Sequence, residues 1–199
     1  MTFLKSKNDS FEFETEDEVT DILNRYFTDG LVLPERYVFF VRTMSLVYLI
    51  VAFETFLKEI LIATFEKKTD ILASSQKSLT LAELLNCDDI ESAKQKLFSE
   101  VASEVISRPI GKTVEYFKQN LGIDISDYVD WERFFERFSR RNALVHSEGI
   151  ADKSYKRETR YSGKKINLNV SDSYLNETIA LFKTVAYKLS IDLENKFYA

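Results

Sequence analysis

The residues best placed for chemistry lie in one short segment, from Arg141 to His146, and His146 is the only histidine among the 199 residues. Asn142 and His146 are four residues apart, so on a helix they share a face, and Arg141 lies one step round. An imidazole exchanges protons near neutral pH, and a guanidinium can hold a phosphate and stabilise negative charge that develops on it. The segment therefore fits metal-free RNA cleavage, in which a 2′-OH attacks the adjacent phosphodiester.

A single histidine cannot act as acid and base at the same time. A two-fold dimer that brings two copies of the segment together would supply the second imidazole. The segment also has a purely structural interpretation, because a histidine near a helix C-terminus is commonly a solvated residue that the helix dipole favours. Asn142 would continue the apolar face of its helix, where a polar side chain needs a partner: a substrate, a neighbouring subunit or Arg141.

Further candidate residues lie outside this segment. Glu54 interrupts the most apolar run of the chain, and it could lie against Arg141 or His146 or pair with a cation at an interface. Basic side chains near the segment could steer an RNA backbone, although each of them alone is more simply a solvated surface residue. These basic residues are Arg137, Arg140, Lys153, Lys156, Arg157, Lys164 and Lys165.

Charge is distributed unevenly along the chain, whose formal net charge is -5. Residues 1–30 carry eight acidic and three basic side chains, whereas residues 131–170 carry ten basic and five acidic ones. The average charge is unlike that of most nucleic-acid-binding proteins, but the second region has the basic character that phosphate binding needs. The acidic N-terminal part could dock on this basic region and restrain its activity.

Composition predicts one mainly helical domain over residues 1–199. Hydrophobic residues make up 45% of the chain, enough for a sizeable core, and five Gly with two Pro leave little turn chemistry for a many-stranded sheet. One cysteine cannot form an internal disulfide, and one thiol with one histidine cannot build a structural zinc site. We therefore expect a reducing, cytoplasmic setting and no metal or cofactor.

No segment is expected to enter a membrane. The first ten residues are charged and lack the apolar centre of a secretory signal. The most apolar run, residues 46–53, is interrupted by Glu54, Lys58 and Glu59, well short of the ~20 residues that a bilayer requires. This run is expected to form a buried helix.

Gly and Pro residues separate the periodic segments and give the boundaries of the expected helices. Those helices are residues 16–27, 35–66, 81–86, 89–107, 112–121, 127–147 and 172–197. The second is apolar nearly all round at its middle, which indicates burial both in a bundle and across a subunit interface. Residues 1–15 form an N-terminal lead, and residues 148–170 form a basic loop of the kind that is usually functional or disordered.

The helix that carries the candidate segment has a clear expected orientation. Its apolar stripe should face the core, and it comprises Trp131, Phe134, Phe135, Phe138 and Val145. The opposite side should stay in solvent, and it comprises Glu132, Arg133, Glu136 and Arg137.

The segment resembles the signature of the HEPN superfamily of all-helical nucleotide-binding and ribonuclease domains: an Arg, four to six residues, then a His, often with an Asn directly after the Arg. Arg141, Asn142 and His146 match all three positions. The order of elements is similar too, from the long apolar helix through the aromatic helix and polar excursion to the closing amphipathic helix. The resemblance implies a dimer with two motifs facing one cleft and metal-independent endoribonuclease activity. It also implies a role in toxin-antitoxin or antiviral defence systems.

One toxin subset of the superfamily has a Tyr two residues after the His, where an antitoxin modifies it. That position is Glu148 in this chain, so we do not expect this form of regulation, although an antitoxin or regulatory protein remains an expected partner. We expect an all-α bundle that cleaves single-stranded or looped RNA, whose 2′-OH groups are free for in-line attack. The alternatives are a non-catalytic HEPN-like module that binds nucleotide, RNA or protein, and a helical domain in which the motif is coincidental.

Overall fold

The computed structural model describes residues 34–75, 77–163 and 167–198. The expected helix over residues 16–27, the N-terminal lead, Lys164 and Lys165 lie outside the described residues. The contact pattern divides the chain between Val41 and Arg42, and the packing described below belongs to the unit that begins at Arg42. Apart from one isolated bridge, the regular structure of the described residues is helical, so the predicted all-α class is confirmed for them.

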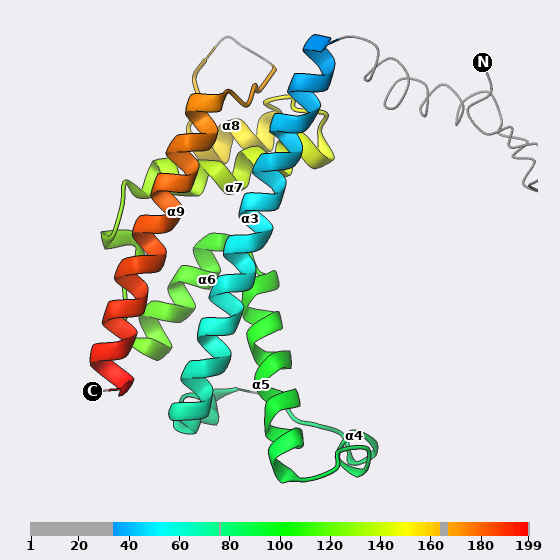
Figure 1. Ribbon diagram of the computed structural model, residues 1–199, viewed down its shortest axis with the longest axis vertical. Helices are drawn as coiled ribbons and strands as arrows, with labels where there is room; N and C mark the ends of the chain where they lie inside the picture. Colours follow the sequence, from blue (N-terminus) through cyan, green and yellow to red (C-terminus); the bar gives the residue numbers. More distant parts are fainter. Residues whose placement is uncertain (1–33, 76, 164–166, 199) are drawn as a thin grey trace, which may run out of the picture. The chain divides into compact units, whose positions relative to one another are not determined.

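The α-helices of the described residues follow one another as shown in Figure 1. They are α3 (Pro34–Lys67), α4 (Leu81–Leu85), α5 (Ile90–Ser107), α6 (Ile110–Tyr116), α7 (Trp131–His146), α8 (Lys153–Thr159) and α9 (Asp172–Leu193). Short 3-10 turns cover Thr69–Ser74 and Ile125–Asp127, and wider π turns, Phe117–Leu121 and Glu194–Tyr198, extend α6 and α9. The predicted boundaries of the long helix, of residues 89–107 and of residues 172–197 agree with these bounds to within a few residues.

The core is built along α3, which begins at Pro34, where a helix tolerates proline because the missing N–H is needed by no intrahelical partner. One face of α3 is buried at helical spacing by Leu46, Ile50, Phe53, Leu57, Leu61 and Phe65. The opposite face is not buried by the described residues: the side of α3 that carries Tyr48, which is 74% exposed, also presents Met44 and Val51 to solvent. The middle of α3 is thus apolar on a side that the described part of the chain leaves exposed.

Helices α3 and α9 lie side by side in the same direction (Figure 1). Near their starts, Arg42 Nε donates to a carboxylate oxygen of Asp172 at 2.7 Å. At their middles the ring of Phe53 stacks on that of Phe182 with centroids 4.4 Å apart, and past the end of α9 the Tyr198 hydroxyl donates to the Ala63 carbonyl at 2.9 Å. These contacts hold the two helices together along their length, and α7 packs against this pair.

Helix α4 differs from the others because none of its residues is buried. It forms through local interactions: the Thr80 hydroxyl accepts a bond from the Glu83 backbone N–H, and the Glu83 carboxylate accepts one from the Thr80 backbone N–H. This reciprocal pair is a capping box, which satisfies backbone donors at the helix start. Figure 1 shows α4 beside the start of α5, apart from α6 to α9.

The basic loop predicted over residues 148–170 contains regular structure. It includes α8, and a single antiparallel bridge pairs Ile150 with Asn167. Helix α8 begins because the Asp152 carboxylate accepts the backbone N–H of Tyr155 at 2.8 Å. The segment therefore leaves the end of α7, forms a short helix and returns to the same place.

Among the described residues, no helix is both long enough and apolar enough to cross a membrane.

Candidate functional site

Helix α7 is oriented by aromatic packing at its first half. The Asp130 carboxylate caps the helix by accepting the backbone N–H of Arg133 at 3.2 Å. Phe134 and Phe138 then pack their rings on Phe53, with centroids 5.7 and 6.4 Å away, and both also contact Phe182. The predicted aromatic face of α7 is thus the face that meets α3 and α9.

The buried side of α7 changes over its last turns. Val145, which the predicted stripe placed in the core, is 53% exposed, whereas Ala143 and Leu144 are buried. The change follows from the excursion after α7, because Ala143 packs with Ala151, Tyr155 and Leu168 of that segment. The end of α7 is therefore buried by local chain that folds back on it and leaves the Val145 side open.

Arg141 is held by a carboxylate from the middle of α3. Its Nη2 donates to Glu54 Oε1 at 2.6 Å, and the two side chains are 24% and 27% exposed. The Arg141 Nε is buried and has no hydrogen-bond partner among the described residues. Glu54 thus fixes one end of the guanidinium, and the side chain remains partly exposed to solvent.

The environment of Glu54 disfavours its ionised form. Burial raises the pKa of Glu54, and the charge of Arg141 and its hydrogen bond only partly offset this effect. Neighbouring charges can therefore readily shift the pKa of this desolvated carboxylate, which has a single guanidinium beside it.

Asn142 and His146 are both exposed on the last turns of α7. The expectation that Asn142 lies on the buried face is wrong, because the residues that cover this part of α7 contact the Ala143 and Leu144 side instead. Both side chains are accessible to a ligand that approaches the end of the helix. His146 is the last residue of α7, and Arg141 lies about one and a half turns before it.

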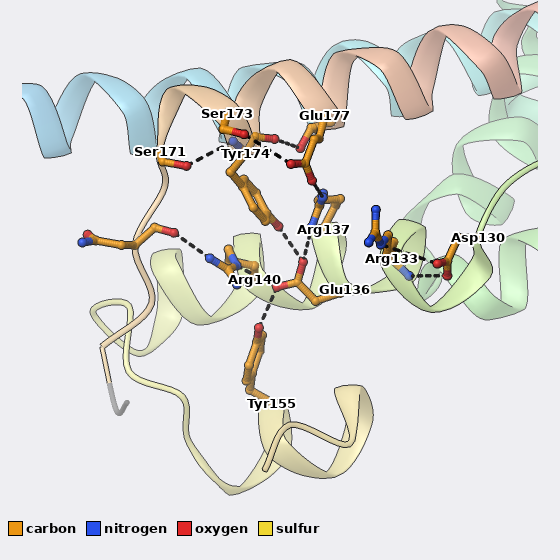
Figure 2. A network of polar contacts seen from close by, with 12 residues as sticks. Asp130, Arg133, Glu136, Arg137, Arg140, Tyr155, Ser171, Ser173, Tyr174 and Glu177 are labelled. Atoms are coloured by element: carbon orange, nitrogen blue, oxygen red, sulfur yellow. Dashed lines mark hydrogen bonds and ion pairs between the residues drawn. The ribbon is translucent and has the colours of Figure 1, made fainter. Parts of the chain in front are cut away.

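A second polar cluster on α7, the Glu136 network, lies one turn before Arg141 (Figure 2). It comprises Glu136, Arg137, Arg140, Tyr155 and Tyr174. Oε1 of Glu136 accepts bonds from Arg140 Nε at 2.7 Å and from the Tyr155 hydroxyl at 2.6 Å, while Oε2 accepts from Arg137 Nη1 at 2.6 Å and from the Tyr174 hydroxyl at 2.7 Å. One carboxylate thus joins α7, α8 and α9.

The two guanidinium groups of the Glu136 network also stack on Tyr174, with Cζ atoms 3.8 Å (Arg137) and 4.3 Å (Arg140) from the ring centroid. Arg137 Nη2 lies 3.3 Å from a carboxylate oxygen of Glu177, and Arg140 Nη1 donates to the Asn169 carbonyl at 2.6 Å. The side chain of Arg137 is only 6% exposed. The expectation that Glu136 and Arg137 lie on a solvated face is therefore wrong: α8 and the start of α9 cover that face.

Electrostatics in the Glu136 network favour the ionised carboxylate. Burial by itself would raise the pKa of Glu136, but the positive charge of Arg140 and the bonds from Tyr155, Tyr174 and Arg140 outweigh it and hold the pKa below its usual value. Burial and the adjacent carboxylate raise the pKa of both tyrosines, so their hydroxyls remain donors. The carboxylate and both hydroxyls of the network are thus paired with one another, whereas the buried Nε of Arg137 has no hydrogen-bond partner among the described residues.

The remaining basic candidates lie on α8. Lys153 and Lys156, predicted to contact RNA, are exposed, as is Arg157. The structure therefore brings Arg141 and Glu54 together, leaves Asn142 and His146 accessible, and engages Arg137 and Arg140 inside the protein. The sequence reasoning missed Tyr155 and Tyr174; the available signal was the four-residue spacing of Glu136 and Arg140, which places them in contact on one helix.

A separate cavity of about 670 Å³ lies between α5 and α6, away from all of these residues. Its cations are already paired, Arg108 with Glu104 at 2.7 Å and Lys112 with Glu115 at 2.7 Å. An anionic ligand would have to displace these carboxylates, so the cavity is a weaker candidate for phosphate binding than the end of α7.

No group of three or more His, Cys, Asp or Glu side chains in the described ranges is arranged to hold a metal ion. Comparison of the chain with models of known protein families, with curated protein sequences and with solved structures finds no match.

Proposed function

We propose that this protein is a metal-independent endoribonuclease of the HEPN type, with Arg141 and His146 as catalytic residues and Asn142 as a residue that binds or orients the RNA. One observation carries the proposal. At the end of α7 the Arg141 guanidinium is held in place by Glu54 and its side chain is still partly exposed, while His146 is exposed at the last residue of the same helix.

In the proposed reaction, the 2′-OH of one nucleotide attacks the adjacent phosphorus. The 2′-oxygen forms a bond to phosphorus as its proton passes to a base, and the bond from phosphorus to the 5′-oxygen breaks as that oxygen takes a proton from an acid. Arg141 stabilises the negative charge that develops on the phosphate oxygens. The products are a 2′,3′-cyclic phosphate and a free 5′-OH, and no bond requires a metal ion or a cofactor.

Acid and base must be different groups, and we propose that two His146 side chains supply them in a homodimer. Met44, Tyr48 and Val51 are spaced to share one exposed face of α3, and Glu54, which holds Arg141, follows one turn later. A second copy covering this apolar face would lie close to the motif. This exposed stripe supports the dimer as the active form.

The substrate proposed is single-stranded or looped RNA, and the proposed place of action is the cytoplasm. The setting, a toxin-antitoxin or antiviral defence system with an antitoxin or regulatory protein as partner, is inferred from the family resemblance alone.

The test is cleavage of a mixed RNA pool in EDTA. Wild type should produce fragments that end in 2′,3′-cyclic phosphate, and Arg141→Ala and His146→Ala should each lose this activity. Arg133→Ala is the matched control, because Arg133 is an exposed arginine of the same helix that lies two turns earlier, and it should cleave like wild type. If wild type bound RNA in a salt-dependent way but did not cleave it, the proposed ribonuclease function would be wrong, and the protein would instead be a non-catalytic binding module.

A further inference from the structure

Helix α8 carries a row of positive charge that the motif does not include. Lys153, Lys156 and Arg157 are spaced so that they project on one side of the helix, and Arg160 follows at its C-cap in a left-handed conformation. All four are exposed. We call these four residues the α8 stripe.

Among the described residues, the carboxylates of Asp152 and Glu158 hydrogen-bond to neutral groups and form no ion pair with Lys153, Lys156 or Arg157. Asp152 caps the helix through the backbone N–H of Tyr155. Glu158 accepts hydrogen bonds from the hydroxyls of Ser139 and Ser154. Arg160 has a distant ion pair with the exposed Glu132, at 3.7 Å. The stripe therefore presents a concentrated positive charge to solvent, as binding of a polyanion requires.

Tyr155 fixes the position of this charge relative to Arg141. It lies on the side of α8 opposite the stripe, is buried, and packs with Ala143, which is two residues after Arg141. Its hydroxyl donates to Glu136 at 2.6 Å, and Glu136 belongs to the same helix as Arg141. Two contacts of Tyr155 thus join α8 to α7, in addition to the hydrogen bond from Ser139 of α7 to Glu158 of α8.

We propose that Tyr155 is a positioning residue for RNA: through Glu136 and Ala143 it holds the α8 stripe in fixed register with the motif. The stripe binds phosphates of a single RNA strand, and the linkage next to the bound phosphates is delivered to Arg141 and His146. This inference rests on the proposed function and adds to it the surface that binds the substrate backbone. Contact with the RNA backbone, which the sequence analysis assigned in part to Arg137 and Arg140, is thereby assigned to the α8 stripe.

Two substitutions separate positioning from general stabilisation. Tyr155→Phe and Tyr174→Phe each remove one hydroxyl that donates to the Glu136 carboxylate, at 2.6 and 2.7 Å. Only Tyr155 lies on α8, because Tyr174 belongs to α9. Binding of fluorescent oligouridine is measured in a His146→Ala background so that the RNA stays intact, and amide hydrogen exchange is measured on the same proteins.

Tyr155→Phe should weaken oligouridine binding by about tenfold or more, the effect of losing one hydrogen bond to a charged group. It should also speed amide exchange in residues 150–163. Tyr174→Phe should leave both quantities within about twofold of the parent. The double variant Lys153→Ala, Lys156→Ala should lower the slope of log affinity against log salt by about 1.4, which is roughly 0.7 for each phosphate that the protein no longer neutralises.

Equal effects of Tyr155→Phe and Tyr174→Phe on oligouridine affinity would overturn the inference, since both would then act through stability alone. An unchanged salt slope in the double variant would also overturn it and would assign the stripe to an acidic protein partner. These binding and exchange measurements do not depend on whether the protein cleaves RNA. A wild-type protein that binds RNA through α8 without cleaving it supports this inference and contradicts the proposed function.

Discussion

Glu54 and Glu136 each contact arginines of α7 and are both partly buried, but burial affects the pKa of the two carboxylates with different net results. Glu54 contacts one guanidinium, and desolvation has the larger effect, so the pKa of Glu54 is raised. Glu136 receives four hydrogen bonds from two arginines and two tyrosines, and these outweigh desolvation. The two residues should therefore give opposite dependences of folding stability on pH.

The pKa of Glu54 is higher in the folded than in the unfolded protein. At pH values between these two pKa values, the folded state therefore binds more protons than the unfolded state. The free energy of unfolding then falls as pH rises from about 4.3, the usual value, through the raised pKa. Glu54→Gln should remove this fall, and its stability relative to wild type should increase from pH 4 to pH 7. Urea unfolding midpoints of the variant and wild type across this pH range measure the change. If the difference between the two midpoints did not vary with pH, the raised pKa of Glu54 would be contradicted.

For Glu136 the folded pKa is lower than the unfolded one, so the stabilisation is present above about pH 4.3 and is lost as pH falls through the folded value. Glu136→Gln should cost about 3 kcal/mol at pH 7, because it leaves the buried Arg137 without its closest counter-charge. The difference from wild type should shrink in acid. Urea titrations at pH 7 and pH 3 test this, and a constant difference would argue against a charged network.

At the scale of elements, the turn after α7 decides where α8 lies. Gly149 has φ of +76°, its backbone N–H donates to the Ala143 carbonyl at 2.9 Å, and its carbonyl accepts the Leu168 N–H at 2.7 Å. Helix α7 has already ended at His146, and Glu148 and Gly149, both with positive φ, turn the chain back toward α7. The position of the α8 stripe therefore depends on the backbone conformation of these two residues.

Gly149→Ala should destabilise the protein by about 1 to 2 kcal/mol, because an L residue is strained at this φ and the new Cβ would lie 3.2 Å from Leu144 Cδ2. Gly111→Ala is the matched control: Gly111 is inside α6, and its nearest neighbour, a ring carbon of Phe135, would be 3.9 Å away. It should stabilise by about 0.5 to 1 kcal/mol. Thermal unfolding of both variants tests this prediction. If the unfolding temperatures of the two variants shifted in the same direction, the proposed conformational role of Gly149 would be contradicted.

At the scale of the whole molecule, the proposed activity depends on association of two chains. The exposed face of α3 that carries Met44, Tyr48 and Val51 is the surface proposed to meet the second copy. A charge placed there would have to be desolvated on association, which is strongly unfavourable without a partner. The folded single chain would not bear this penalty, because these side chains are already exposed.

Tyr48→Glu should convert the dimer to a monomer in sedimentation equilibrium and reduce RNA cleavage with it, since each site would lose the second histidine. Tyr187→Glu is the control, because Tyr187 is 70% exposed on α9, and it should stay dimeric and active. A wild-type chain that is monomeric at all concentrations and still cleaves RNA would exclude the shared site.

Much of the local structure could be predicted from the sequence because its causes lie within a few residues. The capping box of Thr80 and Glu83, the start of α3 at Pro34 and the stripe of α9 depend on neighbours in the chain. The motif of Arg141, Asn142 and His146 was visible for the same reason. Its placement at the end of a helix was predicted correctly.

Only the tertiary structure decided which polar residues are buried. Helical periodicity gives α7 one apolar face toward α3 and α9, but it cannot show that residues 150–163 and 167–168 fold back and cover a second face. That packing buries Arg137, joins Glu136 to Tyr155 and Tyr174, and leaves Asn142 and Val145 exposed. The pairing of Glu54 with Arg141, 87 residues apart, likewise depends on how two helices cross. Such contacts arise from the summed packing of distant segments, which no local pattern encodes.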